Sequence, residues 1–100
     1  MTIKIHSVRF DADKKLLDFV EEKTSKLEVF YDDIIGAEVF LRLDKDTTDR
    51  ENKLVEIKLE IPGTTLFSKK QCKSFEEATD SAIEAIKKQL LKYKDKVRKK

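Results

Sequence analysis

The sequence predicts an α+β fold, a two-layer sandwich in which two helices cover one face of a four-stranded sheet, in the order β-α-β-β-β-α. Two observations carry this prediction. Several short segments alternate apolar and polar residues as strands do, and two longer segments repeat apolar residues with the period of an amphipathic helix. Because the outer faces of the predicted strands are charged, the sheet needs a cover on one side only, which the helices supply. One hundred residues are enough for a single domain, expected to span 1–100.

The first ten residues and the segment after them predict a strand followed by a helix. Ile3 and Ile5 alternate with polar residues, and the alternation changes parity at Val8, which suggests a bulge or an irregular end to a strand over 1–10. Asp13 is then well placed as the N-cap of a helix. The apolar face of that helix recurs at spacings of four, four and three, at Leu16, Val20, Thr24 and Leu27.

Three more strands are predicted in the middle of the chain. Residues 34–43 alternate cleanly, and so do residues 54–61, after a wholly polar stretch at 44–53 that we expect to be an exposed loop. Pro62–Gly63 is a turn signal, and it leads into a less regular strand at 64–72. Alternating strands around a tight turn predict an antiparallel hairpin.

The last helix is expected to run from about Phe75 to Val97. Ser74 and Glu77 have the spacing of a capping box, in which each residue bonds the backbone N–H of the other. The apolar stripe of the second half of the helix is formed by Ile86, Leu90, Tyr93 and Val97.

Composition excludes several classes of function. Charged residues make up 42% of the chain, but the net charge is only +2. His6 is the only histidine and Cys72 the only cysteine, so the residues indicate no disulfide, metal site or nucleophile–base pair. We interpret His6 as an exposed strand residue and assign no role to Cys72. No segment resembles a signal peptide or approaches the roughly 20 apolar residues of a membrane span. We expect a cytoplasmic protein that is not an enzyme and that uses no cofactor, small-molecule substrate or membrane.

The charges are distributed unevenly along the chain. Residues 1–85 carry 14 Lys and Arg against 19 Asp and Glu, a net charge of −5, whereas residues 86–100 carry eight against one, a net charge of +7. At 100° per residue, the basic residues of the last helix fall on both sides of its apolar stripe. An exposed row comprises Lys88, Lys92, Lys96 and Lys99, and a second flank comprises Lys87, Lys94 and Arg98.

The first helix adds a basic edge of its own. Lys15, Lys23 and Lys26 lie on one side of it together with Phe19, and Asp18, Glu21 and Glu28 lie on the other side. If the two helices pack side by side, this edge could join the exposed row of the last helix to form one basic surface.

The basic helix end favours a polyanionic partner. Cations near a helix C-terminus interact favourably with the helix dipole, which accounts for two or three lysines in the last turn. A net charge of +7 over about four turns costs self-repulsion, so a polyanion is favoured over a merely solvated face. A membrane surface is disfavoured because the sheet already needs the apolar stripe.

Whether the polyanionic partner is RNA or DNA is harder to decide from the residues. No helix-turn-helix or zinc pattern is present. The predicted topology is like that of double-stranded RNA-binding domains with an added first strand, and those domains recognise shape through phosphate and 2′-OH contacts. This likeness is one of fold and does not by itself assign a function.

The chain resembles the ribosome hibernation-promoting factor family, also called the ribosome-associated inhibitor, S30AE or sigma-54 modulation protein family. The resemblance covers essentially the whole chain. It is best at Lys26-Leu27-Glu28 with Phe30 and Tyr31, before the Ile34–Ile35 strand, and from Ser74 to Lys96. In that second segment the matching positions are Phe75, Ala78, Asp80, Ala82, Ile86, Lys88, Gln89, Leu90 and Lys92.

The resemblance implies the same β-α-β-β-β-α fold and a specific activity. Such a domain binds the small ribosomal subunit in the channel used by mRNA and tRNA, contacts 16S rRNA and neighbouring ribosomal proteins, and blocks initiation by occupancy in stationary phase or stress. The rRNA contacts are best matched by Lys26, Lys88 and Lys92. Further contacts are inferred from charge and position at Lys23, Lys87, Lys96, Arg98 and Lys99. Off the ribosome, the protein is expected to be a monomer.

This sequence departs from the family pattern in places. Glu76 stands where an aromatic residue is frequent, and Thr79 stands where isoleucine is usual. The chain ends at Lys100, so we expect neither the second domain of the long members nor an extended acidic tail. Two alternatives to a ribosome-specific factor are a general double-stranded RNA-binding module and a protein-interaction adaptor that uses the basic helix.

Overall fold

The computed structural model describes residues 1–44 and 50–98, except the side chain of Arg98, and it has the predicted order of elements. Four strands form one sheet, and two α-helices and a short 3-10 helix accompany it. The strands are β1 (Thr2–Val8), β2 (Gly36–Leu43), β3 (Lys53–Ile61) and β4 (Thr64–Cys72). The helices are α1 (Lys14–Ser25), the 3-10 helix η1 (Lys26–Val29) and α2 (Phe75–Arg98).

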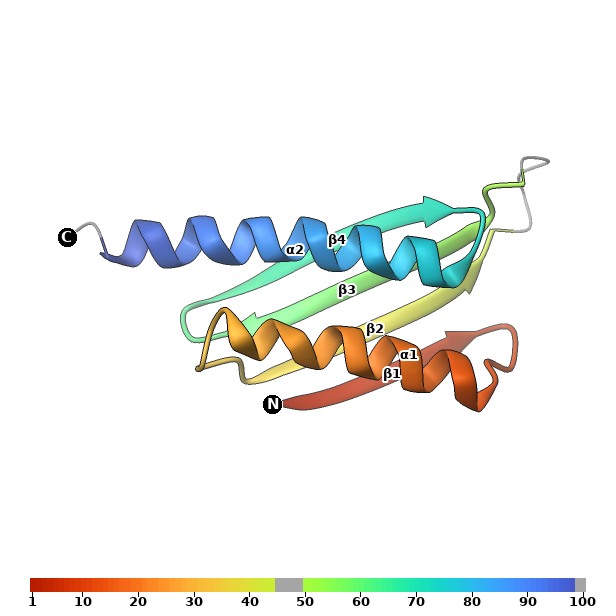
Figure 1. Cartoon of the computed structure of the whole chain (residues 1–100), viewed down its shortest axis with the longest axis horizontal. Helices are drawn as coiled ribbons and strands as arrows, with labels where there is room; N and C mark the ends of the chain where they lie inside the picture. The colour runs from red at the N-terminus through yellow and green to blue at the C-terminus, as the bar shows by residue number, and fades with distance from the viewer. Residues whose placement is uncertain (45–49, 99–100) are drawn as a thin grey trace.

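The sheet has the strand order β1-β2-β3-β4, with β1 parallel to β2 and the other two pairs antiparallel. A parallel pair needs a crossover connection, and α1 with η1 provides it. The β3–β4 hairpin turns at Pro62–Gly63, where Gly63 has a φ of +89°, a conformation that suits glycine. Figure 1 shows α1 and α2 side by side on the same face of the sheet, which confirms the two-layer α+β sandwich.

The core lies between the sheet and the helices. Strand register places apolar residues in one layer: Val39 pairs with Ile57 and Ala37 pairs with Leu59. Because side chains alternate in a strand, a slip of one residue would turn this whole layer toward solvent. The helices contribute Val20, Ala78, Ala82, Ile86 and Leu90, each 0% exposed. The alternation seen in residues 34–43 and 54–61 is therefore the alternation between core and solvent.

The first strand is shorter than predicted. It ends at Val8 instead of residue 10, because Arg9 takes a φ of +66° and turns the chain out of the sheet. The register with β2 is regular through Val8, so Val8 lies on the same face of the strand as His6. The turn at Arg9 then sends Phe10 back toward the helices, where the Phe10 and Phe75 rings stack with centroids 4.9 Å apart.

The first helix begins as predicted and ends earlier. Asp13 caps it, since its Oδ1 accepts a hydrogen bond from the backbone N–H of Leu16 at 2.8 Å. The helix ends at Ser25, and Leu27 is buried by η1, whose tighter turn moves it out of the regular spacing. The polar Thr24 is tolerated in the core because its hydroxyl donates to the Val20 carbonyl at 2.7 Å.

The last helix begins where predicted. The Ser74 hydroxyl accepts from the Glu77 N–H at 3.1 Å, which is one half of the expected capping box. Thr79 is buried and satisfied, because its hydroxyl donates to the Phe75 carbonyl at 2.6 Å. Glu76, which stands where an aromatic residue is frequent in the family that the chain resembles, is exposed.

The apolar stripe of α2 is shorter than predicted. Ile86 and Leu90 are fully buried and Tyr93 is half-buried, but Val97 is 49% exposed, so placing Val97 in the core was wrong. A 24-residue helix is roughly 36 Å long. The nine-residue strands reach only about 30 Å. Figure 1 shows α2 running on past the sheet toward the C-terminus, so its last turns have no sheet beneath them.

The predicted loop at 44–53 is only partly described. Residues 45–49 lie outside the described residues. The backbone N–H of Asp44 bonds the Asn52 carbonyl at 2.9 Å, and β3 begins at Lys53, one residue earlier than predicted.

Truncating α2 at its buried and exposed apolar positions tests where the core ends. Leu90→Ala removes a fully buried side chain and should lower the free energy of unfolding by about 2–5 kcal/mol. Val97→Ala should change it by less than about 0.5 kcal/mol. Urea unfolding followed by circular dichroism measures both. Equal losses would show that the core extends to the end of the helix.

Candidate nucleic-acid interface

The basic residues of α2 are divided between two sides of the helix. Ile86 and Leu90 face the core, which fixes the rotation of α2 about its own axis. Lys88, Lys92 and Lys96 are consequently exposed, and we call them the lysine row. Lys87 and Lys94 lie on the side toward η1 and are half-buried. The structure does not describe the side chain of Arg98, and Lys99 lies outside the described residues.

Part of the lysine row borders a hollow between α2 and β4. Lys88 and Lys92 line it from the helix, and Lys70 lines it from the strand. The Gln89 side-chain amide donates to the Phe67 carbonyl at 2.7 Å, which joins α2 to the edge of β4. The sequence prediction did not include Lys70, although the period of two places it on the helix side of β4 together with Ser68.

The second flank holds the two helical segments together. The Lys87 Nζ lies 4.5 Å from the centroid of the Phe30 ring, a cation–π contact. Lys94 Nζ donates to the backbone carbonyl of Phe30 at 3.3 Å. Two lysines that are seven residues apart on α2 thus hold Phe30 at the end of η1. Lys87, a predicted rRNA contact, already has an intramolecular partner.

The basic edge of α1 does not merge with the lysine row. Lys23 Nζ lies 3.6 Å from Asp80 Oδ1 on α2 and 5.5 Å from the Phe19 ring centroid. Asp80 also lines the α2–β4 hollow, so a carboxylate stands between the two basic regions. The expectation of one continuous basic surface across both helices was wrong at this point, because a wheel drawn for each helix alone cannot show the carboxylate between them.

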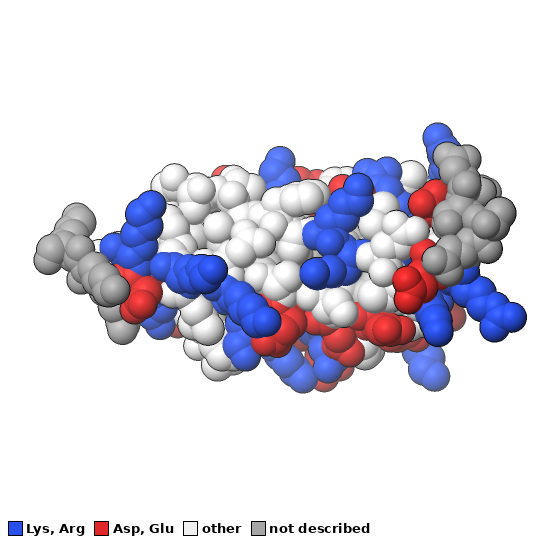
Figure 2. All heavy atoms as spheres, turned by 90° about the horizontal axis from the view of Figure 1, so that it is seen from above, with Lys and Arg blue, Asp and Glu red and all other residues white. Residues whose placement is uncertain are grey.

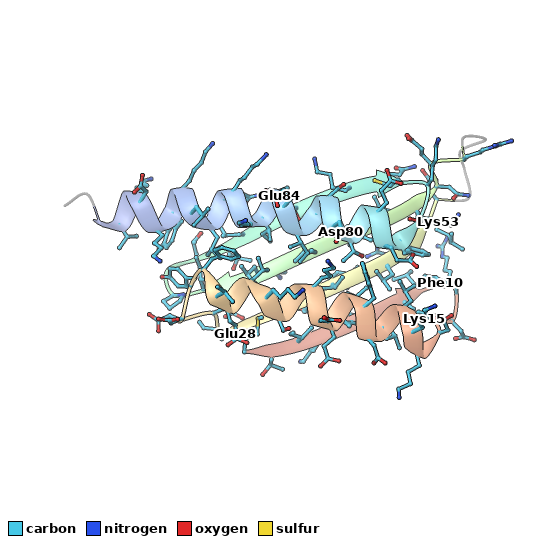
Figure 3. All side chains as sticks on the ribbon, viewed as in Figure 1. Phe10, Lys15, Glu28, Lys53, Asp80 and Glu84 are labelled. Atoms are coloured by element: carbon cyan, nitrogen blue, oxygen red, sulfur yellow. The ribbon has the colours of Figure 1, made fainter. Side chains whose placement is uncertain are left out.

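The remaining lysines of that edge differ in their surroundings. Lys26 has a side chain that is 60% exposed and a 3.9 Å ion pair with Glu22, a distance at which the charge stays available to solvent. Lys15 lines a separate hollow beside Phe10 and Glu76. Figure 3 shows Lys15 near Phe10 at the beginning of α1, far from the C-terminal end of α2.

The charge pattern is visible on the surface. Figure 2 shows Lys and Arg side chains following α2 toward its C-terminal end. Asp and Glu side chains gather along the lower edge of the view, next to this row. Uncharged surface separates this row from a second basic group. Basic side chains of this kind, spaced along a helix without an accompanying row of exposed aromatic rings on it, suit phosphate contacts better than base stacking.

The histidine and the cysteine lie on the two edge strands of the sheet, His6 on β1 and Cys72 on β4. His6 Nε2 bonds Glu38 Oε2 at 3.1 Å and its ring stacks on Phe40 at 4.8 Å, on the sheet face away from the helices. Cys72 is a free, half-buried thiol. Among residues 1–44 and 50–98, no three His, Cys, Asp or Glu side chains are grouped to hold a metal ion. Over the same residues, no helix has the length and apolar character needed to span a membrane.

Fold and surface together define a two-layer α+β domain with a helix that presents a lysine row. Residues 3–98 match the model of the family described as Sigma 54 modulation protein / S30EA ribosomal protein. The chain belongs to this family, as the resemblance implied.

Curated relatives carry the name ribosome hibernation promoting factor. That of Azotobacter vinelandii is 27% identical over 96 residues, which are 96% of this chain and 85% of the relative. That of Klebsiella oxytoca is 28% identical over 98 residues and 98% of each chain. The ribosome hibernation promotion factor of Bacillus subtilis is 31% identical over all 100 residues, which span 52% of its length.

Solved structures share the fold. A ribosomal subunit interface protein from Coxiella burnetii has a TM-score of 0.83 at 20% identity, covering 95% of this chain and 99% of that one. The N-terminal domain of Thermus thermophilus Protein Y has a TM-score of 0.79 at 22% identity, covering 93% and 99%. These likenesses confirm the predicted α+β sandwich.

Paired neutralisations separate the structural lysines from the lysine row. Lys87→Gln with Lys94→Gln removes both contacts to Phe30 and should lower the free energy of unfolding by about 1–2 kcal/mol. Lys88→Gln with Lys92→Gln makes the same charge change and should leave it within about 0.5 kcal/mol of the parent. Thermal and urea unfolding measure the difference. If both pairs lost the same stability, the contacts to Phe30 would not hold the helices together.

Proposed function

We propose that this protein is a ribosome hibernation factor. It binds the small ribosomal subunit in the channel used by mRNA and tRNA and blocks initiation sterically in stationary phase or under stress. The observation that carries the proposal is the exposed lysine row on α2, in a chain that belongs to the family of the named hibernation factors. The protein acts in the cytoplasm as one domain, without catalysis.

The charges suit contact with the backbone of 16S rRNA. Lys88, Lys92 and Lys96 project from one side of a helix, and Lys26 adds an exposed charge on the other helical segment. Lysine ammonium groups are compact charges that bind phosphate oxygens without reading base edges. Lys23 and Lys87 contribute less to rRNA affinity in this proposal, because each must exchange an intramolecular partner for a phosphate.

Occupancy of a channel requires a rigid body, and the fold supplies one. The core side chains of α2 and the bonds from Gln89 and Tyr93 hold this helix on the β3–β4 hairpin. The Tyr93 hydroxyl donates to the Pro62 carbonyl at 3.0 Å, beside the hairpin turn. A pre-organised surface loses little conformational entropy on binding, so a modest number of phosphate contacts gives useful affinity.

Salt dependence tests whether rRNA phosphates are the ligand. The protein should co-sediment with 30S and 70S particles at low salt and be released at high salt. Neutralisation of about five phosphates gives a log–log slope of affinity against salt of about −3.5 to −4.5. Purified protein that stays at the top of a low-salt gradient would refute the proposal.

Charge reversal identifies the face that binds. Lys88→Glu with Lys92→Glu should reduce 30S affinity about tenfold or more and relieve inhibition in a cell-free translation assay. Lys58→Glu with Lys69→Glu makes the same charge change on the sheet face away from the helices and should have little effect on either readout. Unchanged inhibition by the α2 pair would exclude these lysines as contacts.

The closest competing function is a general double-stranded RNA-binding module, which the sheet-and-helices topology favours. Equal affinity for an arbitrary RNA duplex and for 30S subunits would support it over a ribosome-specific factor. Binding to ribosomes that survives nuclease treatment would instead indicate an adaptor that contacts an acidic protein.

A further inference from the structure

We infer that the hollow between α2 and β4 is a binding site for the sugar-phosphate backbone of RNA, with Lys70 of β4 as a contact alongside Lys88 and Lys92. The inference rests on the proposed function and extends it. It places one RNA strand across the α2–β4 junction instead of across the groove between the two helices.

The position of Lys70 follows from the alternation of β4. Ser68 is 5% exposed and its hydroxyl donates to the Ala82 carbonyl at 2.9 Å, so this residue faces α2. Two residues on, Lys70 faces the same way, and at the edge of the sheet its charged end reaches solvent beside α2. Lys69 faces the opposite side of the sheet, where it is the register partner of Glu56.

Both sides of the hollow supply lysine ammonium groups that can bind phosphate. Lys88 and Lys92 are one helical turn apart on α2, and both line the hollow together with Lys70. No hydrogen bond or ion pair within the described residues occupies any of these three ammonium groups, each of which carries three donors. Their charges are therefore free for an anion. Ser81 and Gln89 also line the hollow and add polar groups to it.

Two carboxylates limit the path that a polyanion can take. Asp80 and Glu84 line the hollow from α2, one helical turn apart, and Figure 3 shows both on the first half of the helix. Asp80 is paired with Lys23 of α1, so this carboxylate lies on the border toward α1. A phosphate strand is repelled from that border and is directed from Lys92 past Lys88 toward Lys70. Figure 2 shows Asp and Glu side chains next to the basic row.

This path separates the contacts of the two helices. A strand held by Lys88, Lys92 and Lys70 leaves α1 on the far side of Asp80. Lys26 would then meet a different part of the RNA. A surface that contacts RNA at two separate places fixes the orientation of the domain, whereas a single patch would permit rotation.

The test compares Lys70→Gln with Lys69→Gln, which make the same charge change at neighbouring positions on opposite faces of β4. Lys70→Gln should weaken binding to purified 30S subunits several-fold at 0.1 M salt and reduce the size of the salt slope by about 0.7–0.9. Lys69→Gln should leave both unchanged. Glu84→Gln should strengthen binding, because it removes repulsion within the hollow. Thermal unfolding of each variant confirms that it is folded.

Each other result would overturn the inference. Equal effects of the Lys69 and Lys70 variants would show that only net charge matters. Lost binding in Lys88→Gln with Lys92→Gln, but full binding in Lys70→Gln, would overturn this site and leave the proposed function intact. No binding by the parent protein would overturn both. A loss in Lys70→Gln that persists on nuclease-treated particles would assign the hollow to an acidic protein.

Discussion

The structure depends on the burial of one face of α2 against the β3–β4 hairpin. Ile86 and Leu90 lose all solvent exposure there, and Ala82 is close enough to accept a hydrogen bond from Ser68 of β4. This packing fixes both the position of α2 over the sheet and the rotation of α2 about its own axis. Every other side chain of α2 then has its direction decided, since residues on a helix are related by 100°. The functional surface is a consequence of the hydrophobic contact beneath it.

That single constraint separates lysines that look alike in the sequence. Lys87 and Lys88 are neighbours with the same charge, yet one lies over the Phe30 ring and the other borders open solvent. On β4, Lys69 and Lys70 are likewise neighbours, but they face opposite sides of the sheet because side chains alternate along a strand. The basic composition of the chain thus serves two purposes. Some lysines join α2 to η1, and others remain free for a polyanion.

Much of the fold could be predicted because its signals are local. Alternation identified the strands, and caps at Asp13 and Ser74 identified where the helices begin. The errors occurred where a non-local or unusual conformation intervened. The positive φ of Arg9 ended β1 early. Val97 continues a regular apolar period, but the sheet has already ended beneath it. Periodicity describes one helix and contains no information about the length of its partner.

The sequence by itself determined the α+β class, the strand alternation and the presence of a basic helix end, because these follow from the order of residue types along one element. Only the tertiary structure decided which lysines are available. The pairing of Lys23 with Asp80 and the approach of Lys70 to α2 join residues on different elements. Such pairings depend on how the elements pack together, and packing is set by the fit of the buried core rather than by the charges on its surface.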